Sequence, residues 1–157
     1  MRQMDCDELW VCQMAARLTR EIMGTLAGIQ LSVCDRPLVS TVEMNAVCGF
    51  VDGQYRLRLR FLAEPQLFLR FTRCMAGADA DAVDQELVAE YAAEFFNILC
   101  GRFISELHRV TNSPARFYPT YFEEIPDDSF FAQGEPVRTL YFESDVQELA
   151  EFSWGHG

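Results

Sequence analysis

The longest regular pattern of apolar and polar positions runs from about residue 83 to residue 110 and predicts a helix. Apolar side chains recur there at steps of three and four residues, on one side of the helix: Val88, Ala92, Phe96, Leu99, Phe103, Leu107 and Val110. Polar or small residues follow the other side at the same spacing, and we call them the polar ridge: Glu90, Glu94, Asn97, Gly101, Ser105 and His108. This ridge places the carboxylate of Glu94 one turn from the carboxamide of Asn97, and we expect the chemistry of the protein there.

The remaining segments predict further helices and a set of strands. Helical periodicity covers residues 5–27 and residues 64–75, and Pro65 lies in the first turn of the second segment. Asp81 and Asp84 are candidate N-caps for the longest helix. Alternation rich in β-branched and aromatic residues predicts strands at residues 29–34, 41–50, 54–62, 116–123 and 137–143. Residues 147–154 fit either a last strand or a short helix.

The two long predicted helices share a local pattern. Residues 21–28 and residues 94–101 both begin with glutamate and end with glycine, and each helix is followed by about three predicted strands. This indicates an internal pseudo-duplication in which two helix-plus-strand units share one sheet. Gly24 takes the place of Asn97, so only the second copy carries the amide. The predicted fold is α/β of the α+β type: a two-layer sandwich with a largely antiparallel sheet of about six strands, covered by two long helices and a shorter one.

Length and charge narrow the class of protein. A chain of 157 residues, half of them apolar, is expected to form a single domain, residues 1–157. The net charge of −11 disfavours nucleic acid and anionic membranes as partners, and the absence of lysine excludes a lysine-containing phosphate loop and Schiff-base chemistry. Acidic residues stand near the N-terminus, where a signal peptide would be basic, and no apolar run reaches the length of a membrane span. We therefore expect a soluble, cytoplasmic protein.

Cysteine and histidine positions argue against a metal centre. The six cysteines form no CxxC pair, and the only histidines are His108 and His156. This disfavours a structural zinc site, a disulfide framework and a catalytic cysteine, and it predicts buried, reduced thiols. Because the polar ridge offers no metal ligands beyond its carboxylates and a single histidine, we expect the protein to need no cofactor or metal of its own.

Three arginines, Arg56, Arg58 and Arg60, alternate with apolar residues along one predicted strand and therefore share one face of it. Two interpretations fit this pattern: a solvated sheet face balanced by acidic neighbours, which we favour, or a docking patch for an acidic partner.

The polar ridge and its surroundings resemble the CheX-type chemotaxis phosphatases of the CheC/CheX/FliY group. The resemblance rests on the motif Glu94-Phe95-Phe96-Asn97, on Gly101, on the strands that follow the helix, and on Pro119 inside the first of them. It implies hydrolysis of the aspartyl phosphate of a CheY-like receiver, with Glu94 pairing with the receiver's lysine and Asn97 orienting the attacking water. Mg²⁺ would belong to the phosphorylated receiver. The single intact motif resembles the CheX members, which implies a homodimer.

The implied roles agree with the chemistry of phosphoryl transfer, which needs positioning and charge management more than a covalent catalyst. A neutral amide binds water without adding negative charge beside the phosphate. We assign the flanking residues Glu90, Gly101, Ser105 and His108 to partner binding, although Gly101 equally fits a small residue needed for packing. Two alternatives stay open: a non-catalytic adaptor that binds a receiver or another signalling or flagellar component through the same helix, and a dimer in which the ridge packs against a second subunit.

Overall fold

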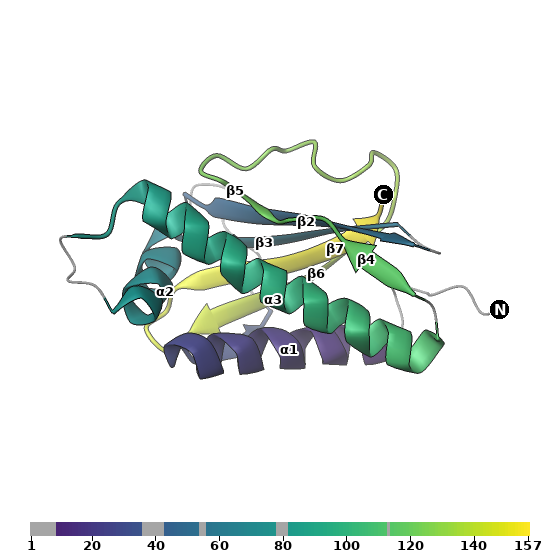
Figure 1. The fold of residues 1–157 in the computed structure, drawn as a ribbon, viewed down its shortest axis with the longest axis horizontal. Helices are drawn as coiled ribbons and strands as arrows, with labels where there is room; N and C mark the ends of the chain where they lie inside the picture. The colour runs from purple at the N-terminus through teal and green to yellow at the C-terminus, as the bar shows by residue number, and fades with distance from the viewer. Residues whose placement is uncertain (1–8, 36–42, 54–55, 78–81, 113) are drawn as a thin grey trace.

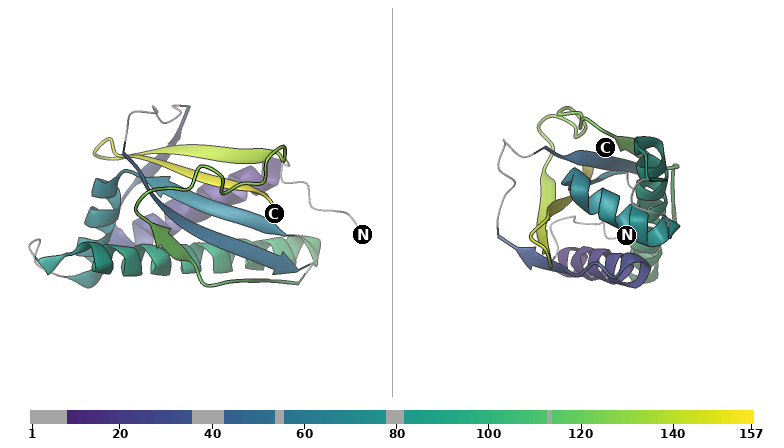
Figure 2. Two further views of the ribbon diagram at one scale, coloured as in Figure 1. Left: turned by 90° about the horizontal axis from the view of Figure 1, so that it is seen from above. Right: turned by 90° about the vertical axis from the view of Figure 1, so that its left-hand side faces the viewer.

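Three helices pack against one face of a single antiparallel sheet in the computed structural model, which describes residues 9–35, 43–53, 56–77, 82–112 and 114–157 (Figure 1). The sheet bends around the two long helices, and the short helix closes one end (Figure 2). This is the predicted α+β sandwich. None of the described helices combines the length and apolarity needed to span a membrane.

Local end signals place the helices close to their predicted limits. They are α1 (Leu9–Ala27), α2 (Pro65–Ala76) and α3 (Gln85–Thr111). Asp84 is the N-cap of α3, because its carboxylate accepts the Leu87 N–H at 2.9 Å, while the other candidate cap, Asp81, lies outside the described residues, as do residues 5–8 of the first predicted helix. Gly77 ends α2 in the left-handed conformation, with a φ of 61°.

All strand pairings in the described part of the chain are antiparallel. The strands are β1 (Leu31–Cys34), β2 (Asn45–Gly53), β3 (Leu57–Ala63), β4 (Ala115–Phe117), β5 (Tyr121–Glu123), β6 (Val137–Ser144) and β7 (Leu149–His156). Residues 147–154 are therefore mostly strand, not helix. The predicted strand at residues 116–123 is two short strands instead of one, and the reason for the break bears on the functional site below.

The strand order β1-β6-β7-β3-β2-β4, with β5 also paired to β2, has the symmetry that the predicted duplication requires. In the two units, β1 corresponds to β4 and β5, β2 to β6, and β3 to β7. When each strand is replaced by its counterpart, the strand order of the sheet is unchanged apart from being read from the opposite edge. The strand that follows each long helix pairs with the other unit: β1 with β6, and β4 and β5 with β2. The two units are thus interleaved rather than placed side by side.

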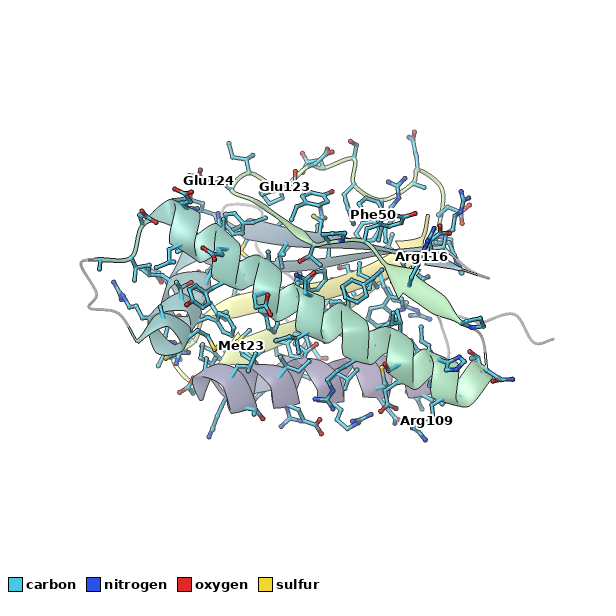
Figure 3. All side chains as sticks on the ribbon, viewed as in Figure 1. Met23, Phe50, Arg109, Arg116, Glu123 and Glu124 are labelled. Carbon is cyan, nitrogen blue, oxygen red and sulfur yellow. The ribbon has the colours of Figure 1, made fainter. Side chains whose placement is uncertain are left out.

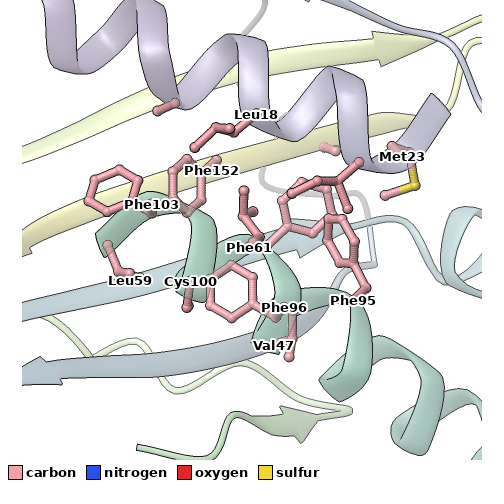
Figure 4. Close-up of a cluster of buried hydrophobic side chains, with 14 of the residues drawn as sticks. Leu18, Met23, Val47, Leu59, Phe61, Phe95, Phe96, Cys100, Phe103 and Phe152 are labelled. Atoms are coloured by element: carbon pink, nitrogen blue, oxygen red, sulfur yellow. The ribbon is translucent and has the colours of Figure 1, made fainter. Parts of the chain in front are cut away.

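Aromatic side chains fill the core between the helices and the sheet (Figure 4). Phe61, on the central strand β3, is fully buried, and its ring centroid lies 5.2 Å from that of Phe95 and 6.0 Å from that of Phe68. Of the apolar positions predicted for α3, only Val110 is wrong. It is 54% exposed, because no described element covers that side of the last turn of the helix.

Residues 124–136 form a loop over the face of the sheet that the helices leave free, and Phe50 and Glu123 lie beneath it (Figure 3). Arg60 donates to the Asp127 carbonyl at 2.8 Å, and its guanidinium lies over the ring of Phe130, while Arg58 donates to the Phe130 carbonyl. For Arg58 and Arg60, both interpretations of the arginine face are therefore wrong. These two side chains form neither a solvated face nor a docking patch for an acidic partner. Both guanidinium groups hold this loop.

No described cysteine forms a disulfide, and Cys6 lies outside the described residues. Cys48 and Cys100 are buried as predicted, but Cys74 is exposed on α2, contrary to the expectation of buried thiols. Burial raises the pKa of the Cys48 thiol to about 12, helped by the Glu123 carboxylate that accepts from its Sγ at 3.2 Å. Burial also raises the pKa of Cys100.

These differences predict site-selective thiol reactivity. At pH 8 iodoacetamide is expected to modify Cys74 at least about 10²-fold faster than Cys48 or Cys100, because alkylation requires an accessible thiolate. Peptide mass spectrometry at several reaction times gives the rate for each site. In concentrated urea the three rates should converge. Rapid modification of Cys100 in the native protein would contradict its burial.

Candidate functional site

The six residues of the polar ridge share the side of α3 that faces away from the core. Glu90, Glu94, Ser105 and His108 are exposed, while Asn97 and Gly101 are half-buried. The difference arises because the Asn97 and Gly101 turns pass against the β4–β5 segment. Glu94 and Asn97 are three residues apart on one helix and therefore project from neighbouring positions of the same face.

Thr120 makes two hydrogen bonds to the part of α3 that carries Asn97. The Thr120 N–H donates to Asn97 Oδ1 at 3.1 Å. The Thr120 hydroxyl donates to the Ala93 carbonyl, one turn earlier in α3, at 2.6 Å. Within the described part of the chain, the side-chain amide nitrogen of Asn97 makes no hydrogen bond, and its oxygen keeps a second lone pair for a ligand.

Pro119 explains why Thr120 turns toward the helix. Proline has no N–H to give to a sheet, so the predicted strand breaks into β4 and β5 on either side of it. Val51 pairs with Phe117 and Cys48 with Tyr121, so two residues of β2 face three residues of the broken strand, as in a bulge. The Thr120 N–H is thereby released from the ladder and reaches α3.

Gly49 on β2 makes this approach possible. A Cβ at Gly49 would lie 3.1 Å from Cys100 Sγ and 3.4 Å from Thr120 Cγ2. A Cβ at this position would require its neighbours on α3 and at Thr120 to move by a few tenths of an ångström. Sequence reasoning singled out neither Thr120 nor Gly49. The only signal pointing to this contact was a proline inside a predicted strand.

The copy of this site on α1 lacks the amide, and its carboxylate is already paired. Gly24 replaces the asparagine, and Glu21, the counterpart of Glu94, forms ion pairs with Arg17 at 3.7 Å and with Arg102 at 3.2 Å. Glu94, by contrast, forms no ion pair with any described residue and has an exposed carboxylate. Of the two copies, the one on α3 therefore presents a carboxylate next to an amide with no ion pair to a described residue.

Gly101 lies against the ring of Phe117 on β4. A Cβ at Gly101 would stand 3.5 Å from Phe117 Cε1, an ordinary contact distance. Gly101 thus lies at a packing contact, but the distance leaves room for a methyl group, so packing does not require glycine itself. Its predicted role in partner binding stays a prediction.

Replacing Gly101 by alanine is therefore expected to stabilise the protein. Alanine in a helix interior is favoured over glycine by about 0.5–1 kcal/mol, and the ring of Phe117 leaves room for the new methyl group. Urea denaturation followed by circular dichroism measures the change in the free energy of unfolding. A lower value for Gly101→Ala would mean that the ring cannot tolerate the methyl group.

Ser105 and His108 line an open pocket of about 210 Å³ with Ile104, Pro114 and Ala115. It continues the polar ridge toward the C-terminal end of α3 and provides a concave surface between this helix and the segment leading into β4. Among the described residues, no group of three histidine, cysteine, aspartate or glutamate side chains is arranged to hold a metal ion.

The sequence matches no protein-family model and none of the curated proteins. Solved structures, however, share its fold. The chemotaxis protein CheX from Desulfovibrio desulfuricans superposes with a TM-score of 0.74 at 14% identity, over 95% of this chain and 100% of that one.

Two further structures match over most of their length. CheX from Borrelia burgdorferi, solved in a complex with CheY, BeF₃ and Mg²⁺, has a TM-score of 0.74 at 14% identity and covers 93% of this chain and 97% of its own. FliY from Thermotoga maritima has a TM-score of 0.65 at 11% identity, over 93% of this chain and 85% of that one. At such identities the similarity establishes a common fold.

Proposed function

We propose that this chain, which has the fold of the CheC/CheX/FliY group, hydrolyses the aspartyl phosphate of a CheY-like receiver protein. The observation that carries the proposal is the pair of functional groups on one turn of α3: an exposed carboxylate, Glu94, beside an amide, Asn97, whose oxygen is fixed by Thr120. A CheX of the same fold has been solved together with CheY.

Asn97 has the chemistry needed to place a water molecule. With its oxygen bound to the Thr120 N–H, the carboxamide presents its NH₂ group and one remaining lone pair of the oxygen. These groups hold a water in line with the scissile P–O bond, and hydrolysis follows when the water oxygen attacks phosphorus and the receiver's carboxylate leaves. Positioning of this kind removes a large part of the entropic barrier.

Glu94 supplies charge complementarity to the receiver. Its carboxylate is exposed and forms no ion pair within the described part of the chain, so a lysine of the partner can bind it without displacing another cation. The receiver would bring the Mg²⁺ that balances its phosphoryl group. Glu90, Ser105 and His108 extend the contact along the polar ridge. Homodimer formation also stays a prediction.

The decay of a phosphorylated receiver tests the proposal. A CheY-like receiver carrying ³²P on its aspartate is incubated alone and with one-hundredth of its molar amount of this protein, across a panel of purified receivers. The proposal expects release of inorganic phosphate to accelerate for at least one receiver, with many turnovers per protein molecule.

Complex formation with an unchanged decay rate, for every receiver that binds, would overturn the phosphatase proposal and support the adaptor instead. Binding is measured separately by calorimetry, with the receiver held in its activated form by BeF₃⁻ and Mg²⁺. Because adaptor and phosphatase both bind, only the turnover measurement separates them.

A further inference from the structure

We infer that Thr120 is a positioning residue that fixes the orientation of the Asn97 carboxamide; the inference rests on the proposed function for its catalytic consequence. Thr120 belongs to the short segment between β4 and β5 and makes its two hydrogen bonds to the same turn of α3. Neither contact belongs to a helix or a strand ladder.

The first contact selects one of the two possible orientations of the amide. A backbone N–H is only a donor, so the Thr120 N–H donates to the Asn97 oxygen at 3.1 Å. The flipped amide is disfavoured, because it would place the NH₂ group, also a donor, against this N–H. Since the carboxamide is planar, binding of the oxygen by Thr120 directs the NH₂ group away from Thr120. A water molecule therefore meets one fixed arrangement of donor and acceptor.

The second contact fixes Thr120 itself. Its hydroxyl donates at 2.6 Å to the Ala93 carbonyl, the same carbonyl that the helix pattern assigns to the Asn97 N–H. Thr120 is only 9% exposed, and its methyl group packs toward Gly49 on β2. The hydroxyl, the methyl group and the N–H of Thr120 thus each have a defined neighbour. These three contacts together keep the Thr120 N–H at a constant distance from the Asn97 amide.

Thr120→Val tests the inference, because valine keeps the branched shape and loses only the hydroxyl bond to Ala93. At saturating receiver, the maximal dephosphorylation rate is expected to fall on the order of tenfold, since small displacements of a positioning group cost this much or more. The affinity for the BeF₃⁻-activated receiver should change less than about twofold. Thr120→Ser, which keeps both hydrogen bonds, should restore the rate.

Thr72→Val is the matched control. The Thr72 hydroxyl is buried in α2 and donates to the Phe68 carbonyl at 2.7 Å, so this variant also loses one hydroxyl-to-carbonyl bond, but one that lies within a different helix from Asn97. Its maximal rate should equal that of the wild type. An equal loss in Thr72→Val and Thr120→Val, or wild-type activity in Thr120→Val, would overturn the inference.

A second measurement does not depend on catalysis. In ¹⁵N-labelled protein, the side-chain NH₂ order parameter of Asn97 should fall in Thr120→Val and stay unchanged in Thr72→Val and Thr120→Ser. If the wild type accelerates the decay of no receiver, the proposed function fails. The order parameter then still tests whether Thr120 restricts the motion of the Asn97 amide. An Asn97 order parameter that Thr120→Val leaves unchanged would then refute the inference.

Discussion

Replacing Asn97 by alanine is expected to lower the receiver-phosphatase rate by about 10²-fold or more, the usual cost of removing one group that positions or stabilises the reacting atoms. Alanine keeps the helix and removes the amide that would hold the attacking water. The rate is measured as release of phosphate from ³²P-labelled receiver under single-turnover conditions. Gln13→Ala removes a carboxamide from an exposed position of α1 and should leave the rate unchanged.

The same variant should still bind the receiver, because Glu94 and the rest of the polar ridge are intact. It loses the hydrogen bond from the Thr120 N–H, and this is expected to cost about 1 kcal/mol of stability while leaving the fold unchanged. Thermal denaturation and calorimetry with the BeF₃⁻-activated receiver check both points. Full phosphatase activity of folded Asn97→Ala protein would refute the mechanism.

Phe61→Ala is expected to have the largest effect on stability, a loss of about 3–5 kcal/mol in the free energy of unfolding. Phe61 is fully buried on the central strand, and its ring packs against Phe68 and Phe95, so the cavity cannot be filled by a small shift of one neighbour. Urea denaturation measures the change. Phe131→Ala, in the half-buried loop over the other face of the sheet, should lose less.

A similar loss from the two phenylalanines would contradict the view that stability is concentrated between the helices and the sheet. The comparison is informative because the same number of atoms is removed in both variants. It separates the cavity left in a closed core from the loss of contacts in a loop that water reaches.

Periodicity predicted the helices well because each has a continuous apolar side and a local end signal. Asp84 caps α3, Pro65 begins α2 and Gly77 ends it, and all three act through their own backbone or nearest turn. The same local logic located Glu94 and Asn97 on one face of α3. Val110 is the exception. Its exposure depends on where the neighbouring elements end, and the spacing of apolar residues along one helix does not predict that.

The remaining parts of the site depend on contacts between segments distant in sequence. Thr120 reaches Asn97 across 23 residues, and Arg60 reaches the loop carbonyl of Asp127 across 67 residues. Alternation along a strand predicts that arginines share a face, but it does not predict whether water, a partner or the protein's own loop covers them. Pro119 signalled a break in a strand without indicating what the freed N–H would bind.

Because the sheet is interleaved, the half of the chain without the motif contacts the turn of α3 that carries Asn97 through the β4–β5 segment. β4 and β5 follow α3 in sequence yet rest on β2, and Gly49 of β2 leaves the space that Thr120 occupies. Since strands of each half pair with strands of the other, we expect neither half of the chain to fold on its own. The half of the chain without the amide therefore shapes the surroundings of Asn97 in the other half, through positions well outside the four-residue motif.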